Sequence, residues 1–201
     1  KWLKYYTIII CGAKKKGEIL VGMQNIHEIE NVLNSYEIKK YYKMLINTNS
    51  WSINSAYGEE IYSNFYPMFR VMYEDDIYNP FWFGFFSGIV SSINSRLQKE
   101  KGFDLGGYEI KNVVLNASQN VNKFHFHEHR DFRYVIVGFL TPEWDESWGG
   151  ELGMEEKKIK FKPGNFVLFS GHNLHDAMPV KINLPFWRIS VGIFLKWEAT
   201  A

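Results

Sequence analysis

The sequence predicts an α+β fold in which a mainly helical first half packs against an antiparallel β-sandwich or barrel. The main observation is a change in hydrophobic spacing near residue 105, from the three-to-four-residue period of helices to the two-residue period of strands. The chain has 201 residues, 46% of them hydrophobic, which is enough to bury a core without disulfide or metal support. We therefore expect one domain over residues 1–201, with 1–105 as mainly helical support and 106–198 as the strand-rich core.

Two helices are expected in the first half. Apolar residues within 25–47 and within 80–101 recur at helical spacing, which places them on one face of each helix. An Asn-Pro pair at 79–80 is a suitable start for the second helix, and Gly102 is a suitable stop. Residues 48–78 are rich in Asn, Ser and Tyr, and this composition predicts an irregular connection.

The second half is predicted to consist of short strands separated by tight turns. Glycine-containing turn signals occur at 148–150 and 162–164, and no helical pattern separates the apolar segments. Consecutive short strands of this kind favour antiparallel sheets. The expected strands are 108–117, 123–130, 133–140, 151–154, 158–161, 165–170, 176–180 and 186–197.

Composition excludes several classes of protein. Lysine plus arginine (23) nearly balances aspartate plus glutamate (22), so no electrostatic case exists for a nucleic acid or an anionic membrane as partner. Cys11 is the only cysteine, which rules out an intrachain disulfide and a cysteine-rich zinc site. The most apolar early run, 7–11, is too short to span a membrane. We expect a soluble, intracellular, cytoplasmic protein, and the sequence carries no signal for its oligomeric state.

Five of the six histidines lie within a short part of the chain. Three of them, together with one aspartate, occupy every second position of one segment. His125, His127, His129 and Asp131 are each two residues apart, so on a strand they share one face. Two imidazoles, or an imidazole and a carboxylate, at this spacing can converge on one metal ion about 2.0–2.2 Å away. A third ligand must come from elsewhere in the chain, and His175 is the best candidate.

His175 is preferred to its neighbour His172 on spacing. The two residues are three apart, so an extended chain cannot present both to the same side. His175 leads directly into the next expected strand. We expect His172 to lie in a loop.

The last expected strand combines an apolar face with a polar one. Ile189 and Val191 belong to an apolar series, whereas Arg188 and Ser190 lie on the opposite face. A fixed guanidinium beside a hydroxyl is a suitable clamp for a carboxylate.

Taken together, these segments resemble the Fe(II)- and 2-oxoglutarate-dependent oxygenase superfamily, in particular its prolyl-4-hydroxylase-like members. The resemblance covers residues 108–197 and consists of the histidine strand, segments 140–144, 148–152 and 163–175, and the Arg188-x-Ser190 pair. It implies a double-stranded β-helix, a cupin-like jelly roll, buttressed by N-terminal helices. It also implies that a His-x-Asp/Glu pair and a distal histidine bind iron.

The resemblance further implies an enzyme, a dioxygenase that uses Fe(II), 2-oxoglutarate and O2, with ascorbate as a candidate additional cofactor. Such enzymes normally hydroxylate a C–H bond and release succinate and CO2. Carried over to this chain, His175 is the distal iron ligand, and Arg188 with Ser190 holds the far carboxylate of 2-oxoglutarate. The substrate would be a small molecule or a peptide, with peptidyl proline as one candidate.

Two registers are open for the first ligand pair. His129 with Asp131 supplies a carboxylate that partly neutralises Fe(II), but it leaves a very short connection to the next strand. His127 with His129 leaves more room and gives a three-histidine site. We slightly favour the Asp131 register. The three-histidine alternative would also suit a cupin-like dioxygenase that does not use 2-oxoglutarate, and a non-catalytic jelly-roll binding module is the remaining alternative.

Overall fold

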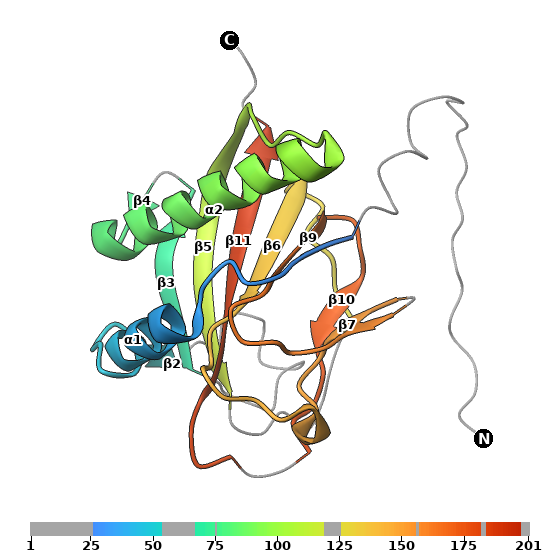
Figure 1. The fold of residues 1–201 in the computed structure, drawn as a ribbon. Helices are drawn as coiled ribbons and strands as arrows, with labels where there is room; N and C mark the ends of the chain where they lie inside the picture. The colour runs from blue at the N-terminus through green and yellow to red at the C-terminus, as the bar shows by residue number, and fades with distance from the viewer. Residues whose placement is uncertain are drawn as a thin grey trace, which may run out of the picture.

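A computed structural model describes residues 26–53, 67–74, 76–118, 126–155, 157–181 and 184–197 (Figure 1). These residues form two helices, a short 3-10 helix and two sheets of eight and three strands whose pairings are all antiparallel. The fold class expected from the sequence is confirmed, because this arrangement matches solved jelly-roll structures described below.

The larger sheet has the strand order β1-β9-β6-β11-β5-β3-β2, and β4 pairs with β3. Its strands are β1 (His27–Ile29), β2 (Ser52–Ile53), β3 (Pro67–Tyr73), β4 (Asp76–Ile77), β5 (Tyr108–Ser118), β6 (Tyr134–Phe139), β9 (Phe166–Ser170) and β11 (Arg188–Trp197). The smaller sheet has the order β10-β7-β8, formed by β7 (Leu152–Met154), β8 (Lys158–Ile159) and β10 (His175–Ala177). The 3-10 helix η1 (Glu146–Trp148) precedes β7.

The helix α2 (Pro80–Lys101) begins and ends where the sequence predicts. The side chain of Asn79 accepts a hydrogen bond from the backbone N–H of Trp82 at 3.2 Å, and Gly102 ends the helix with a left-handed φ of 64°. In the described part of the chain, neither helix has the combination of length and apolar character needed to cross a membrane.

The first expected helix is shorter than predicted. Helix α1 (Ser35–Ile46) starts after Asn34, whose side chain and that of Glu37 form a reciprocal capping box. Residues before this cap form β1 instead, paired with β9. The capping box explains the boundary, because it satisfies the free N–H groups of the first turn at this point.

The first half of the chain also contributes strands to the larger sheet, which the sequence analysis did not predict. β3 lies in the segment expected to be irregular, and it pairs with β5 from Met68 to Tyr73. Its strand structure depends on this pairing with a distant segment, so local composition did not reveal it. In contrast, the expected strand 123–130 contributes, within its described residues, a single bridge between His127 and His175.

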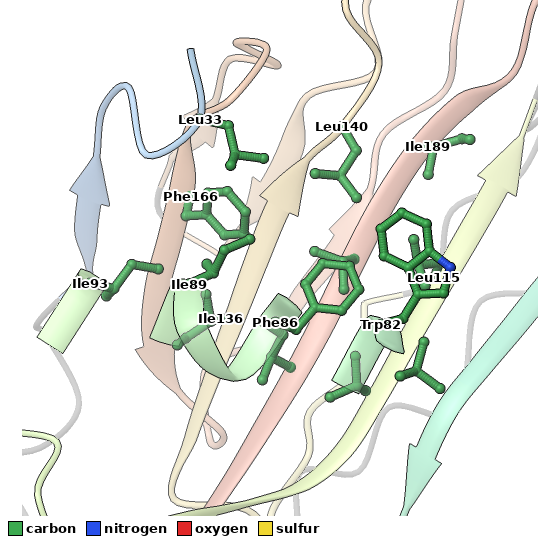
Figure 2. Packing of buried hydrophobic residues seen from close by; sticks show 14 of the residues in the cluster. Leu33, Trp82, Phe86, Ile89, Ile93, Leu115, Ile136, Leu140, Phe166 and Ile189 are labelled. Carbon is green, nitrogen blue, oxygen red and sulfur yellow. The ribbon is translucent and has the colours of Figure 1, made fainter. Parts of the chain in front are cut away.

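Two apolar cores lie on opposite faces of the larger sheet. Helix α2 lies across one face (Figure 1), where Phe86 and Ile89 pack with Ile136, Phe166 and Ile189 of the sheet (Figure 2). The second core joins the other face to the smaller sheet and its loops; it includes Phe139, Val167, Phe169 and Phe194 together with Leu152, Met154, Ile159 and Phe161.

Strand β11 contributes to both cores and therefore sets the orientation of its polar residues. Ile189 and Val191 belong to the core under the helices, and Phe194 belongs to the core facing the smaller sheet. Because side chains alternate along a strand, Arg188 and Ser190 share the face of Phe194. We call this the inner face. The two-residue alternation expected for this strand is thus confirmed.

Replacing Phe86 with alanine tests the packing of α2 on the sheet. The ring is 0% exposed, so its loss is expected to lower the free energy of unfolding by about 3–5 kcal/mol in urea denaturation. Phe81 lies in the same helix but is 57% exposed, and Phe81→Ala is expected to cost less than about 1 kcal/mol. Equal losses in the two variants would contradict the packing described here.

Candidate active site

Three histidines from two distant segments come together at the edge of the smaller sheet. One ligand nitrogen from each of His127, His129 and His175 lies within 4.8 Å of the others. His127 and His175 form an antiparallel bridge in which each backbone N–H donates to the other's carbonyl, at 3.1 and 2.9 Å. Directly opposite residues place their side chains on the same face, so this bridge brings the two imidazoles together. The N–H of His129 donates to Gly171 at 2.7 Å, which holds the third ring in place.

The surroundings of His129 and His175 favour neutral imidazoles. Burial, together with the neighbouring His175 and His127, lowers the pKa of His129 to about 3. Burial also lowers the pKa of His175 to about 4. The Nδ1 of His175 donates to the backbone oxygen of Asn173 at 2.9 Å, because a carbonyl can only accept. This leaves Nε2 of His175 with a free lone pair, which is the form that binds metals.

Asp131, the predicted carboxylate ligand, does not join this cluster. It is exposed, and its oxygens are not among the ligand atoms that converge. The strand alternation stops at His129, because the N–H of Phe132 donates back to the carbonyl of His129 at 2.9 Å and closes a turn. The preferred register was therefore at odds with the geometry, which matches the open alternative of His127 with His129.

The other residues considered near the site lie apart from the three rings. His172 is exposed in the loop before β10, as expected. Glu128 forms an ion pair with Arg130 at 2.6 Å, on the opposite side of the segment from His127. His125 lies outside the described residues.

Besides the histidine cluster, the inner face carries a buried cation, Arg188. Its side chain is buried, with the residue 4% exposed, and its Nε and Nη2 both donate to the carbonyl of Gly150, at 3.2 and 2.8 Å. The guanidinium lies over the ring of Phe161, 5.0 Å from its centroid. None of the ion pairs among the described residues includes Arg188. Burial lowers its pKa to about 10, so the group stays charged at neutral pH.

Strand β11 connects the histidine cluster to Arg188. Phe194, on the inner face of β11, packs against the ring of His129 with centroids 4.7 Å apart. Ser190 and Arg188 follow on the same face, and Ser190 is buried as well. The inner face thus carries neutral nitrogen donors at one end and a buried cation with a hydroxyl at the other.

Residues 115–196 match the family model of the 2OG-Fe(II) oxygenase superfamily. This part of the chain belongs to that superfamily. The matched span contains all three clustered histidines, Arg188 and Ser190. As a superfamily member the protein is an enzyme, and Fe(II) and 2-oxoglutarate are the cofactors that the superfamily implies. No curated protein sequence matches the chain.

Solved oxygenase structures share the fold at low sequence identity. An oxidoreductase of the 2OG-Fe(II) oxygenase family from Burkholderia pseudomallei superposes with a TM-score of 0.62 at 15% identity, covering 85% of this chain and 84% of that one. The viral collagen prolyl hydroxylase of Paramecium Bursaria Chlorella virus-1 gives 0.61 at 14% identity, covering 94% and 98%. A Trichoplax adhaerens prolyl hydroxylase, solved with a hypoxia inducible factor peptide, gives 0.59 at 20% identity, covering 85% and 83%.

The residues of the oxygenase fit the implied cofactors. Imidazole nitrogens suit iron, and the rings of His129 and His175 remain neutral at pH values where free histidine takes up a proton. The buried guanidinium and adjacent hydroxyl suit a carboxylate. In this donor set, His127, His129 and His175 are the residues able to hold the metal, and Arg188 with Ser190 the residues able to hold the co-substrate.

A glycine and a tryptophan that the sequence analysis did not assign to the site support Arg188. Gly150 has φ +73°, and a Cβ there would lie 2.8 Å from the ring of Trp144 and 3.1 Å from Nε of Arg188. Trp144 is held by a 3.0 Å hydrogen bond from Nε1 to Gly149 and by contact with Phe161, with ring centroids 4.3 Å apart. The Trp-Gly-Gly sequence at 148–150 was interpreted as a turn signal and as part of the family resemblance, and it also marks this close approach.

Gly150→Ala is expected to destabilise the fold through this contact. The added methyl group must displace Trp144 or Arg188 and must adopt a left-handed φ, together costing about 2–4 kcal/mol. Gly84→Ala is the control, because a Cβ in this part of α2 meets nothing within 4 Å and a helical Gly→Ala change stabilises by about 0.5–1 kcal/mol. Chemical denaturation should show a lower free energy of unfolding for Gly150→Ala and a higher one for Gly84→Ala. An unchanged free energy of unfolding in Gly150→Ala would contradict the described packing.

Proposed function

We propose that the protein is an Fe(II)- and 2-oxoglutarate-dependent dioxygenase that hydroxylates a C–H bond and releases succinate and CO2. In this proposal His127, His129 and His175 hold the iron, and Arg188 with Ser190 holds the far carboxylate of 2-oxoglutarate. The observation that carries the proposal is Arg188, a buried cation that forms no ion pair with a described residue.

The surroundings of Arg188 support an anionic ligand. A buried charge is costly unless it is paired and hydrogen-bonded. Here the carbonyl of Gly150 and the ring of Phe161 contact the guanidinium, and the carboxylates of Asp176 and Glu151 raise the pKa of Arg188 without forming an ion pair with it. Nη1 takes no part in these contacts and provides donors for a bidentate carboxylate. A dicarboxylate such as 2-oxoglutarate supplies the missing negative charge.

The histidine cluster supports a metal site without a carboxylate ligand. Three imidazoles leave the full charge of a divalent ion uncompensated, and the anionic co-substrate then balances this charge together with that of Arg188. When bound, iron supplies the redox chemistry that couples O2 to the oxidation of 2-oxoglutarate and substrate. The chain's own residues hold and orient these groups.

For the substrate we propose a peptide containing proline. Two of the structural neighbours are described as prolyl hydroxylases, and one of them was solved with a peptide. Because a shared fold does not establish a shared substrate, the proposal needs a direct assay. Succinate release should be measured with matched peptides that contain or lack proline, beside free amino acids, nucleosides and sugars. Stimulation by proline-free peptides alone would overturn this part.

The all-imidazole cluster also favours a second candidate, a three-histidine dioxygenase that does not use 2-oxoglutarate. Its metal ligands would be the same residues. The two candidates differ at Arg188, which has no role as a co-substrate clamp in the second. The tests below therefore separate metal binding from co-substrate binding.

Metal titration tests the ligand set. His129→Ala removes one nitrogen of the cluster and is expected to weaken anaerobic Fe(II) or Co(II) binding at least about 10-fold. Asp131→Ala changes an exposed side chain and is expected to leave the affinity within about twofold. If Asp131→Ala weakens binding as strongly as His129→Ala, the three-histidine ligand set is incorrect.

Substitution of Arg188 tests the co-substrate clamp. Loss of charged hydrogen bonds is expected to weaken 2-oxoglutarate binding about 10- to 100-fold in Arg188→Ala, with Fe(II) affinity within about twofold. The visible charge-transfer band formed when 2-oxoglutarate is added anaerobically to the Fe(II) protein provides the titration signal, and Arg188→Lys is the charge-retaining control. Wild-type protein that turns over substrate without 2-oxoglutarate would favour the second candidate.

A further inference from the structure

Two asparagines on β5 each have a buried side-chain oxygen without a hydrogen-bond partner. The Oδ1 atoms of Asn112 and Asn116 are inaccessible to solvent, and neither has a partner in the structure. In the register of β5 and β11, Asn116 lies opposite Ser190 and Asn112 lies opposite Phe194. Opposite residues of an antiparallel pair share a face, so both carboxamides lie on the inner face.

Unpartnered buried polar atoms are rare because each one costs free energy. Among the described residues, buried side-chain atoms without a partner occur in these two asparagines and in His27. His27 belongs to β1, at the far edge of the larger sheet, whereas the two asparagines lie on one strand and one face. Of the two, Asn116 is the one whose register position lies beside Arg188 and Ser190, where a ligand could supply the missing partner.

The neighbours of Asn116 identify the kind of ligand. Arg188 lies opposite Ser118, and Ser190 lies opposite Asn116, so these four residues form one polar block across two paired strands. Ser118, Ser190 and Arg188 are all buried, and the only formal charge in the block is that of the guanidinium. A block of hydroxyls, a carboxamide and one cation is suited to an anion.

The carboxamide of Asn116 can donate as well as accept. Its oxygen and nitrogen ends have nearly the same size, so rotation by half a turn brings the NH2 group to the position of the unpartnered oxygen. We infer that Asn116 binds the far carboxylate of 2-oxoglutarate beside Arg188 and Ser190. This inference rests on the proposed function, because it adds a residue to the same co-substrate site.

Asn112 is a matched control on the same strand. It has the same unpartnered atom and the same orientation, but it lies four residues, or about 13 Å, along β5 from Asn116. Its cross-strand neighbour is Phe194, which contacts His129 rather than Arg188. A carboxylate bound at Arg188 is therefore out of its reach.

The experiment measures ligand affinity without turnover. Protein loaded with Mn(II) is titrated in the absence of O2 with 2-oxoglutarate and with 2-oxobutyrate, which lacks the far carboxylate. Asn116→Ala is expected to weaken 2-oxoglutarate binding about 5- to 20-fold, and Asn116→Asp about 100-fold because of charge repulsion. 2-Oxobutyrate should bind both Asn116 variants as it binds the wild type, within about twofold. Asn112→Ala should bind both ligands within about twofold of wild type.

The outcomes separate this inference from the proposed function. If wild-type protein does not bind 2-oxoglutarate, or Arg188→Ala binds it equally well, the proposed function fails. If those results hold but both Asn116 variants bind 2-oxoglutarate like the wild type, the role of Asn116 alone is overturned. Equal weakening of 2-oxobutyrate would also overturn it, because a general structural effect does not depend on the far carboxylate. Circular dichroism and thermal unfolding confirm that the variants are folded.

Discussion

The architecture of the inner face depends on holding one buried cation inside the protein. Arg188 stays in place because Gly150 offers its carbonyl to two guanidinium nitrogens, and Phe161 offers its ring. This geometry requires a residue without a side chain at Gly150, since a Cβ would press on both Trp144 and Arg188. The loop before β7 therefore packs closely around the guanidinium, which forms no ion pair with a described residue.

Periodicity predicted those parts of the protein whose structure is set locally. The alternation of β11 placed Arg188 and Ser190 on one face, and the Asn79 and Gly102 caps delimited α2. β3 was missed because its strand structure depends on pairing with β5, a contact that no local pattern encodes. Asp131 lies apart from the three histidines for a related reason. Alternation predicts a shared face only while the strand continues, and the backbone turns at His129.

The histidine cluster shows how backbone pairing can replace a sequence motif. His127 and His175 are far apart in the chain, yet reciprocal hydrogen bonds between their backbones make them direct neighbours. The short turn after His129 leaves Asp131 outside the cluster, whereas the bond from the His129 N–H to Gly171 holds His129 beside the other two rings. The inner face thus carries imidazole nitrogens at one end and the guanidinium at the other, where the carboxylates of Asp176 and Glu151 favour the charged form of Arg188.

Strand β11 sets the separation between these two ends. It is paired on both sides, with Phe194 opposite Asn112 and Val135, and Ser190 opposite Asn116 and Phe139. A one-residue slip of a central strand held by two ladders would reverse the faces of all its side chains, so the sheet fixes Arg188, Ser190 and Phe194 on the inner face. His129 lies outside the strands and is held by its backbone bond to Gly171 and by the ring of Phe194. A dicarboxylate bound as we propose would have to span from the guanidinium to the histidine cluster, so this arrangement would favour one chain length over shorter or longer homologues.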